Sequence, residues 1–83
     1  MDIEEIRTLI VEGLSGARVE IDGDGRHFSA IVVSELFSGK SMVQQHQLVY
    51  KTLGDKMGAE IHALSIKTYT PEQWSGQQDL RVI

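Results

Sequence analysis

The sequence predicts an α+β fold in which helices cover one face of a three-stranded sheet. Apolar residues recur at helical spacing in the first 14 residues and again after residue 41, three short segments have strand patterns, and turn or cap residues separate them. The predicted order is helix, strand, strand, helix or helix pair, strand, helix. A chain of 83 residues can bury one modest core, so we predict a single domain over residues 1–83.

The first helix occupies the N-terminal segment. Its apolar face consists of Ile3, Ile6, Leu9, Ile10 and Leu14. Asp2 and Glu5 have the spacing of a capping box at the start of a helix, and Gly13 and Gly16 are typical of its end.

A hairpin is predicted next. Segment 17–22 alternates Val19 and Ile21 with acidic residues, as a half-buried strand does, and segment 28–34 is rich in β-branched residues. Between them, segment 23–27 contains two glycines that can adopt positive φ. The loop is longer than the minimal hairpin turn.

The second helix follows a connection at residues 35–40. Ser41 and Gln44 again have capping-box spacing. The predicted apolar face consists of Val43, His46, Val49, Tyr50, Leu53 and Met57. Glycine is unfavourable inside a helix, so Gly54 is expected to split or bend this one, and Gly58 to close it.

The third strand is predicted at residues 61–68. Its alternation places His62 on the same face as the apolar residues, near a strand end. Thr70 and Pro71 then have the N-cap and first-turn preferences of a short final helix that contains Trp74. The polar tail, residues 77–83, is expected to fray.

Composition excludes several classes of function. The chain has no cysteine, so it cannot form a disulfide or supply a thiolate ligand, and any metal must be held by histidine, carboxylate or a partner. The N-terminus is acidic and no apolar stretch is long enough for a bilayer, so we expect a cytoplasmic protein without membrane contact. A net charge of -4 does not favour phosphate backbones.

The local motifs have simple structural interpretations. Segment 38–41 resembles the end of a phosphate-binding loop, but Ser34 stands where that motif needs glycine, so a helix cap is favoured. Asp22 and Asp24 flank Gly23, which favours turn chemistry over a calcium site. No pattern places Ser, His and Asp together as catalytic residues, so we do not expect an enzyme.

The three histidines differ in their predicted surroundings. His46 lies on the apolar face of the second helix, where a buried, hydrogen-bonded histidine is expected. His27 lies in a glycine-containing loop, and His62 starts a strand. The last two can meet if the loop folds over that strand end. Spacing alone favours structural roles but leaves a metal site open.

Three segments of the chain resemble the BolA family: residues 23–28, residues 35–41 leading into 46–50, and above all residues 61–71. The resemblance covers nearly the whole chain, and histidine in place of cysteine in the first loop is similar to the acidic, IbaG-type branch. It implies a fold like that of class II KH domains, with the element order predicted above.

The resemblance also implies a cofactor and a partner. BolA-like proteins pair with monothiol glutaredoxins and share a bridging 2Fe-2S cluster. On this interpretation the glutaredoxin cysteine and a glutathione thiol bind one side, while His62 and His27 are the iron ligands on the other side. Half of the ligands would belong to another molecule, which suits cluster trafficking or sensing. A role in stress response is implied by the family alone.

Two other functions remain open. A DNA-binding transcriptional regulator is the second choice, because KH-like folds bind nucleic acid in other proteins. The net charge opposes DNA binding, and no Gly-x-x-Gly loop of the KH kind is present between helices. The third is a homodimerising module that binds no cluster.

Overall fold

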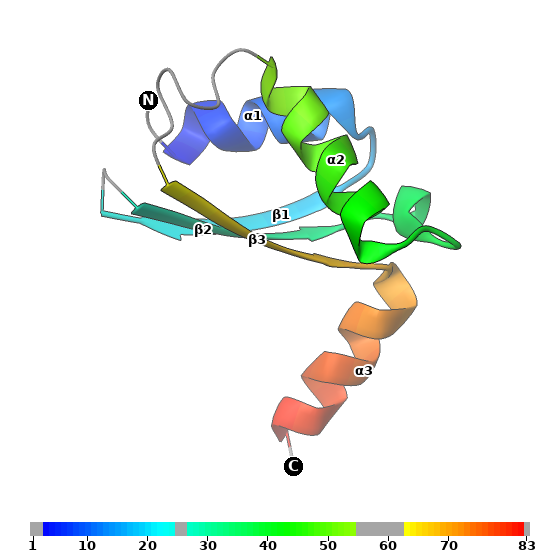
Figure 1. Ribbon diagram of the computed structural model, residues 1–83. Helices are drawn as coiled ribbons and strands as arrows, with labels where there is room; N and C mark the ends of the chain where they lie inside the picture. The colour runs from blue at the N-terminus through cyan, green and yellow to red at the C-terminus, as the bar shows by residue number, and fades with distance from the viewer. Residues whose placement is uncertain (1–2, 25–26, 55–62, 83) are drawn as a thin grey trace.

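A computed structural model describes residues 3–24, 27–54 and 63–82 (Figure 1). In chain order the elements are α1 (Ile3–Gly13), β1 (Arg18–Gly23), β2 (His27–Val33), the 3-10 helix η1 (Glu35–Phe37), α2 (Met42–Leu53), β3 (Ala63–Tyr69) and α3 (Pro71–Val82). The predicted α+β class and the order of elements are confirmed. Gly58 and Met57 lie outside the described residues, so the predicted second half of a helix pair is not placed.

The sheet is mixed, with the order β1-β2-β3. Strands β1 and β2 are antiparallel, from Arg18 opposite Val33 to Gly23 opposite Phe28. Strands β2 and β3 are parallel, and Val33 pairs with Tyr69 at one end of this ladder. The parallel pair places the start of β3 beside the start of β2, at the end of the sheet where the β1–β2 turn lies (Figure 1).

Helices α1 and α2 cover one face of the sheet, and the core lies between (Figure 1). The core residues are Ile6, Ile10, Leu14, Phe28, Val32, Phe37, Val49 and Leu53. Leu64 and Ile66 of β3 pack against this cluster, whereas Ser65 and Lys67 are exposed. The predicted alternation of β3 is therefore confirmed for its described residues.

Helix α3 does not join the layer formed by α1 and α2. It leaves the end of β3 on the opposite side of the sheet and projects away from it (Figure 1). Its first turn is held by a capping box, in which Gln73 N donates to Thr70 Oγ1 at 3.2 Å and Thr70 N donates to Gln73 Oε1 at 2.9 Å. The predicted N-cap is confirmed, and Trp74 is buried beside Tyr69.

The final helix is longer than predicted. The sequence pattern predicts fraying over residues 77–83, but α3 continues to Val82. Gly76 does not end it, because glycine in a helix interior costs only about 1 kcal/mol relative to alanine. Residues 77–81 include no proline or β-branched residue, so the backbone can remain helical. No helix of the described ranges is long and apolar enough to cross a membrane.

Helix α2 begins and ends at the expected signals. Ser41 Oγ accepts a hydrogen bond from Gln44 N at 3.2 Å, and Ser41 N donates to Gln44 Oε1 at 3.0 Å, which confirms the predicted capping box. Gly54 closes α2, with a φ of 55° and its N–H bonded to the carbonyl of Tyr50, and the segment that would form the second part of a split helix lies outside the described residues. Positive φ is accessible to glycine at little cost, which explains why the helix stops there.

The apolar face of α2 is narrower than predicted. Val49 and Leu53 are buried, but Val43 is 66% exposed and Tyr50 is 38% exposed. Successive residues of an α-helix are separated by about 100° around its axis, so Tyr50 and Val43 lie on the flank of the stripe centred on Val49. His46, predicted to be buried, is only half-buried.

Candidate histidine site at the β1–β2 turn

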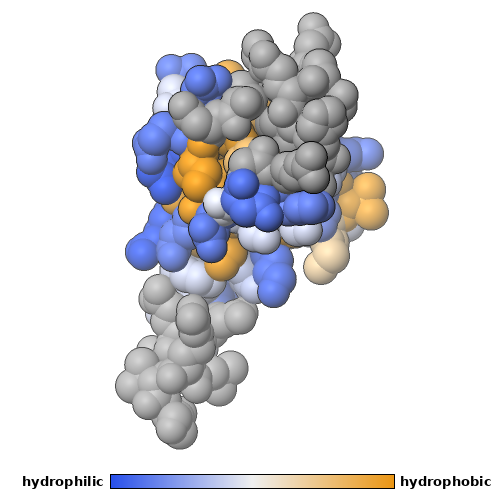
Figure 2. Space-filling view, turned by 90° about the vertical axis from the view of Figure 1, so that its left-hand side faces the viewer, coloured by the Kyte–Doolittle hydropathy of each residue, from blue (hydrophilic) through white to orange (hydrophobic). Residues whose placement is uncertain are grey.

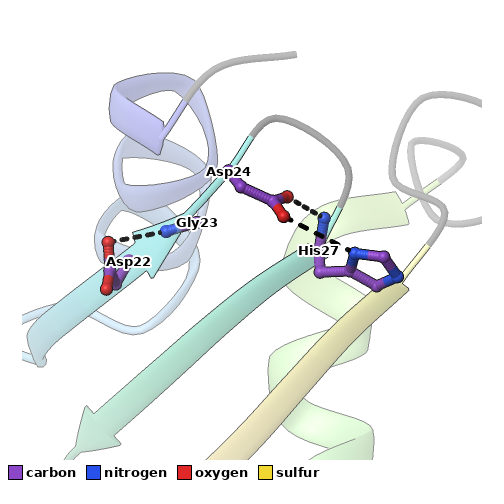
Figure 3. Close-up of polar contacts among 4 residues, drawn as sticks. All are labelled: Asp22, Gly23, Asp24 and His27. Atoms are coloured by element: carbon purple, nitrogen blue, oxygen red, sulfur yellow. Dashed lines mark hydrogen bonds and ion pairs between the residues drawn. The ribbon is translucent and has the colours of Figure 1, made fainter.

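The β1–β2 turn is closed by Asp24. Its backbone N donates to His27 O at 3.2 Å, and its Oδ1 accepts a hydrogen bond from His27 N at 2.8 Å. The carboxylate thus acts as an Asx-type turn residue, which confirms the predicted turn chemistry. These bonds fix the backbone of His27 where β2 begins (Figure 3).

The preceding residues leave little space around the turn. A Cβ at Gly23 would lie 2.6 Å from Phe28 Cδ1 and 2.8 Å from His27 O, so this position requires glycine for the close approach of the two strands. Asp22 Oδ1 accepts from Gly23 N at 2.8 Å and lies apart from the His27 ring (Figure 3). The two aspartates therefore have separate contacts.

The side chain of His27 is open to solvent. It is 76% exposed, and its Nδ1 lies 3.8 Å from Oδ2 of Asp24, whose side chain is 70% exposed. The end of the sheet that carries this turn faces the viewer in Figure 2, where the described residues are mostly hydrophilic. An exposed imidazole on an ordered backbone can reach a ligand or a partner molecule without breaking any core contact.

The parallel ladder bears on the second predicted ligand, His62, through the residue that follows it. His27 pairs with Ala63, which directly follows His62 in the sequence. His62 itself lies outside the described residues. This pairing is what the hypothesis of two neighbouring histidines requires.

The full sequence offers imidazole and carboxylate donors but no thiolate. Within residues 3–24, 27–54 and 63–82, no group of three or more His, Asp or Glu side chains could hold a metal ion. Two imidazoles would complete half of a tetrahedral iron site, and the chain has no thiolate to add. Any thiolate ligand would therefore come from another molecule.

The contact between Asp24 and His27 was not foreseen from the sequence, which gave Asp24 a turn role only. The signal that could have revealed it is the Asp-x-x-His spacing within a glycine-containing loop. The carboxylate of Asp24 accepts from the backbone N–H three residues on, so a histidine at that position lies next to the carboxylate.

Comparison with known proteins decides the family. The family model described as BolA-like protein matches residues 7–73. The chain belongs to the BolA family. It is 42% identical over 81 residues to the acid stress protein IbaG of Escherichia coli K12, with 96% of each chain covered. It is also 37% identical over 57 residues to the DNA-binding transcriptional regulator BolA of the same strain, covering 69% of this chain and 54% of that protein.

Solved structures give the same assignment. A BolA homologue from Coxiella burnetii is 43% identical and superposes with a TM-score of 0.82, covering 90% of this chain and 97% of the other. The predicted resemblance to the BolA family and to its IbaG-type branch is therefore confirmed. The roles of His62 and His27 stay predictions.

Proposed function

We propose that this BolA-family chain traffics or senses iron-sulfur clusters by forming a heterodimer with a monothiol glutaredoxin and sharing a bridging 2Fe-2S cluster. The observation that carries the proposal is the register of the parallel ladder, in which the exposed His27 pairs with the residue that follows His62. The proposed role is binding rather than catalysis. A reducing compartment keeps the partner's thiols available, so we expect the heterodimer in the cytoplasm.

The residues of this chain would contribute binding and orientation. His62 and His27 would each offer a neutral imidazole nitrogen to iron, while the partner's cysteine and glutathione would supply thiolates. Imidazole ligation raises the reduction potential of such a cluster relative to thiolate ligation alone. Because imidazole must be unprotonated to bind, and half of the ligands lie on another molecule, the shared cluster would be transferable and sensitive to acid.

The decisive test is an anaerobic titration of cluster-loaded, glutathione-bound monothiol glutaredoxin with this protein, followed by visible circular dichroism. We expect a new heterodimer spectrum that is lost in His62→Ala and altered in His27→Ala. His46→Ala is the matched control, because it removes the third histidine from α2, and its spectrum should equal that of wild type. Far-UV spectra check that each variant is folded.

If the titration gives the spectrum of the glutaredoxin alone, both with the wild-type protein and with every variant, the cluster proposal is refuted. In that case DNA binding becomes the leading alternative, favoured by the 37% identity to a relative named as a DNA-binding transcriptional regulator. Plain protein scaffolding, including a homodimer of this chain, is the remaining outcome, and sedimentation of the purified protein would detect such a homodimer.

A further inference from the structure

We propose that Asp24 is a positioning residue for His27, because its carboxylate holds the imidazole with Nδ1 turned toward Oδ2 and thereby presents Nε2 as the ligating nitrogen. The ligand role of His27 rests on the proposed function. The orientation of the ring does not, since it is a property of the free protein and can be measured without glutaredoxin or cluster.

Three contacts join the same two residues, and Figure 3 draws the two that the carboxylate makes. The backbone bond from Asp24 N to His27 O closes the turn at 3.2 Å, and Asp24 Oδ1 accepts from His27 N at 2.8 Å. With one carboxylate oxygen fixed by the backbone amide, the other is directed to the ring and lies 3.8 Å from Nδ1. Both side chains are largely exposed, so core packing does not impose this arrangement.

A neutral imidazole carries one ring proton, and its neighbours decide which nitrogen holds it. A carboxylate accepts only, so it favours the tautomer with the proton on Nδ1 and leaves the lone pair on Nε2. A separation of 3.8 Å exceeds a direct hydrogen bond, so the bias acts through charge–dipole attraction or a bridging water. Carboxylates that accept a hydrogen bond from the second nitrogen of a metal-binding histidine typically raise metal affinity about 10–100-fold, and the longer separation here favours the low end of that range.

Asp24→Asn separates the two roles of the carboxylate, which are to accept the backbone hydrogen bond of the turn and to orient the His27 ring. The amide oxygen of asparagine can still accept from His27 N, so the turn is retained. The other end of the side chain becomes an NH₂ group, which donates and therefore favours the opposite tautomer, with the proton on Nε2. Asp22→Asn is the matched control, because Asp22 accepts from Gly23 N and lies apart from the ring.

The test is long-range ¹H–¹⁵N correlation spectroscopy of the cluster-free protein at alkaline pH, where imidazole is neutral. We expect the Nδ1–H tautomer of His27 to predominate in wild type and in Asp22→Asn, and the Nε2–H tautomer to predominate in Asp24→Asn. A wild-type spectrum dominated by Nε2–H, or a ratio that Asp24→Asn leaves unchanged, would overturn the positioning role.

The circular dichroism titration then separates the two proposals. We expect Asp24→Asn to weaken cluster retention by the heterodimer about tenfold, with Asp22→Asn equal to wild type. If the tautomer changes while His27→Ala leaves the heterodimer spectrum unaltered, the ligand role of His27 fails and the orientation by Asp24 stands. If His27→Ala alters the spectrum while Asp24→Asn changes neither the tautomer nor retention, the positioning role fails and the shared cluster stands.

Discussion

Two valines of helix α2 have opposite surroundings. Val49 is fully buried in the core, whereas Val43 is 66% exposed in the first turn of the same helix. Substituting alanine for valine changes helix propensity at both positions but removes buried apolar surface only at Val49. The comparison therefore separates the free energy of burial from the effect of helix propensity. A buried methyl group contributes about 0.8 kcal/mol of transfer free energy, and a cavity left behind adds to the loss.

We predict that Val49→Ala lowers the free energy of unfolding by about 1.5–3 kcal/mol. Val43→Ala should change it by less than about 0.5 kcal/mol, and in the stabilising direction, because alanine has the higher helix propensity. Urea denaturation followed by far-UV circular dichroism measures both values. Equal losses at the two positions would contradict the burial assigned to α2.

Single-residue surroundings were only partly predictable from the sequence. Helical spacing placed Val43, Val49 and Tyr50 together on one apolar face, but a periodic pattern does not specify how wide a stripe the neighbouring elements will cover. The turn role of Asp24 followed from residue type and its place beside Gly23. Its contact with His27 did not, because that contact depends on how the turn closes.

At the scale of elements, Gln45 connects α2 to the neighbouring segments by side-chain hydrogen bonds. Its Nε2 donates to Phe37 O at 3.2 Å and to Lys40 O at 3.0 Å, and its Oε1 accepts from Thr68 Oγ1 at 2.5 Å. One half-buried amide therefore joins the helix to η1, to the loop that follows it and to β3. The donors of the amide are essential here, because Phe37 and Lys40 both present carbonyl oxygens to it.

We predict that Gln45→Glu lowers the free energy of unfolding by about 1–3 kcal/mol, since it removes two donors and brings a carboxylate against two carbonyls. The neighbouring Gln44→Glu is the matched control. Gln44 completes the capping box, where glutamate serves equally well and its charge suits the helix N-terminus, so stability should be unchanged or slightly higher. Thermal unfolding at neutral pH compares the two, and equal effects would refute the bridging role.

Elements that depend on local signals were predictable, and those that depend on tertiary contacts were less so. The start of α2 followed from Ser41 and Gln44 alone, since both partners of a capping box lie within one turn. The side-chain hydrogen bonds of Gln45 join residues up to 23 positions apart in the sequence. No local sequence pattern reveals such contacts. Helix α3 is longer than the short final helix predicted from its N-cap, because the polar composition of residues 77–82 does not prevent helix formation.

For the whole molecule, the alternation of apolar residues and the turn signals were enough for the α+β architecture. The strand–helix–strand order of β2, α2 and β3 is compatible with parallel pairing, but the register that brings His27 opposite Ala63 is visible only in the structure. The candidate site therefore combines a locally determined turn with a pairing between strands that are distant in sequence. Residue types suggested the two histidines, and the topology pairs His27 with Ala63, the residue that follows His62 in the sequence.

Charge distribution over the whole chain bears on the DNA-binding alternative. The net charge is -4. On the sheet face opposite α1 and α2, Lys67 shares a row with Glu20 across Ile31, and Asp22 lies on the neighbouring row. This face therefore presents mixed charges rather than the basic surface that a phosphate backbone attracts.

We accordingly predict that a labelled duplex binds this protein with a dissociation constant weaker than about 10⁻⁴ M near physiological salt, the weak end of non-specific binding. Fluorescence anisotropy over a series of salt concentrations measures it, with and without an unlabelled competitor duplex. Each phosphate neutralised by Lys or Arg contributes about -0.9 to the slope of log K against log salt, so a chain with few aligned cations should give a shallow slope.

Tight binding with a slope steeper than about -5 would mean that at least five phosphates are neutralised. The mixed-charge face could not supply so many contacts, and DNA regulation would then displace cluster sharing as the favoured function.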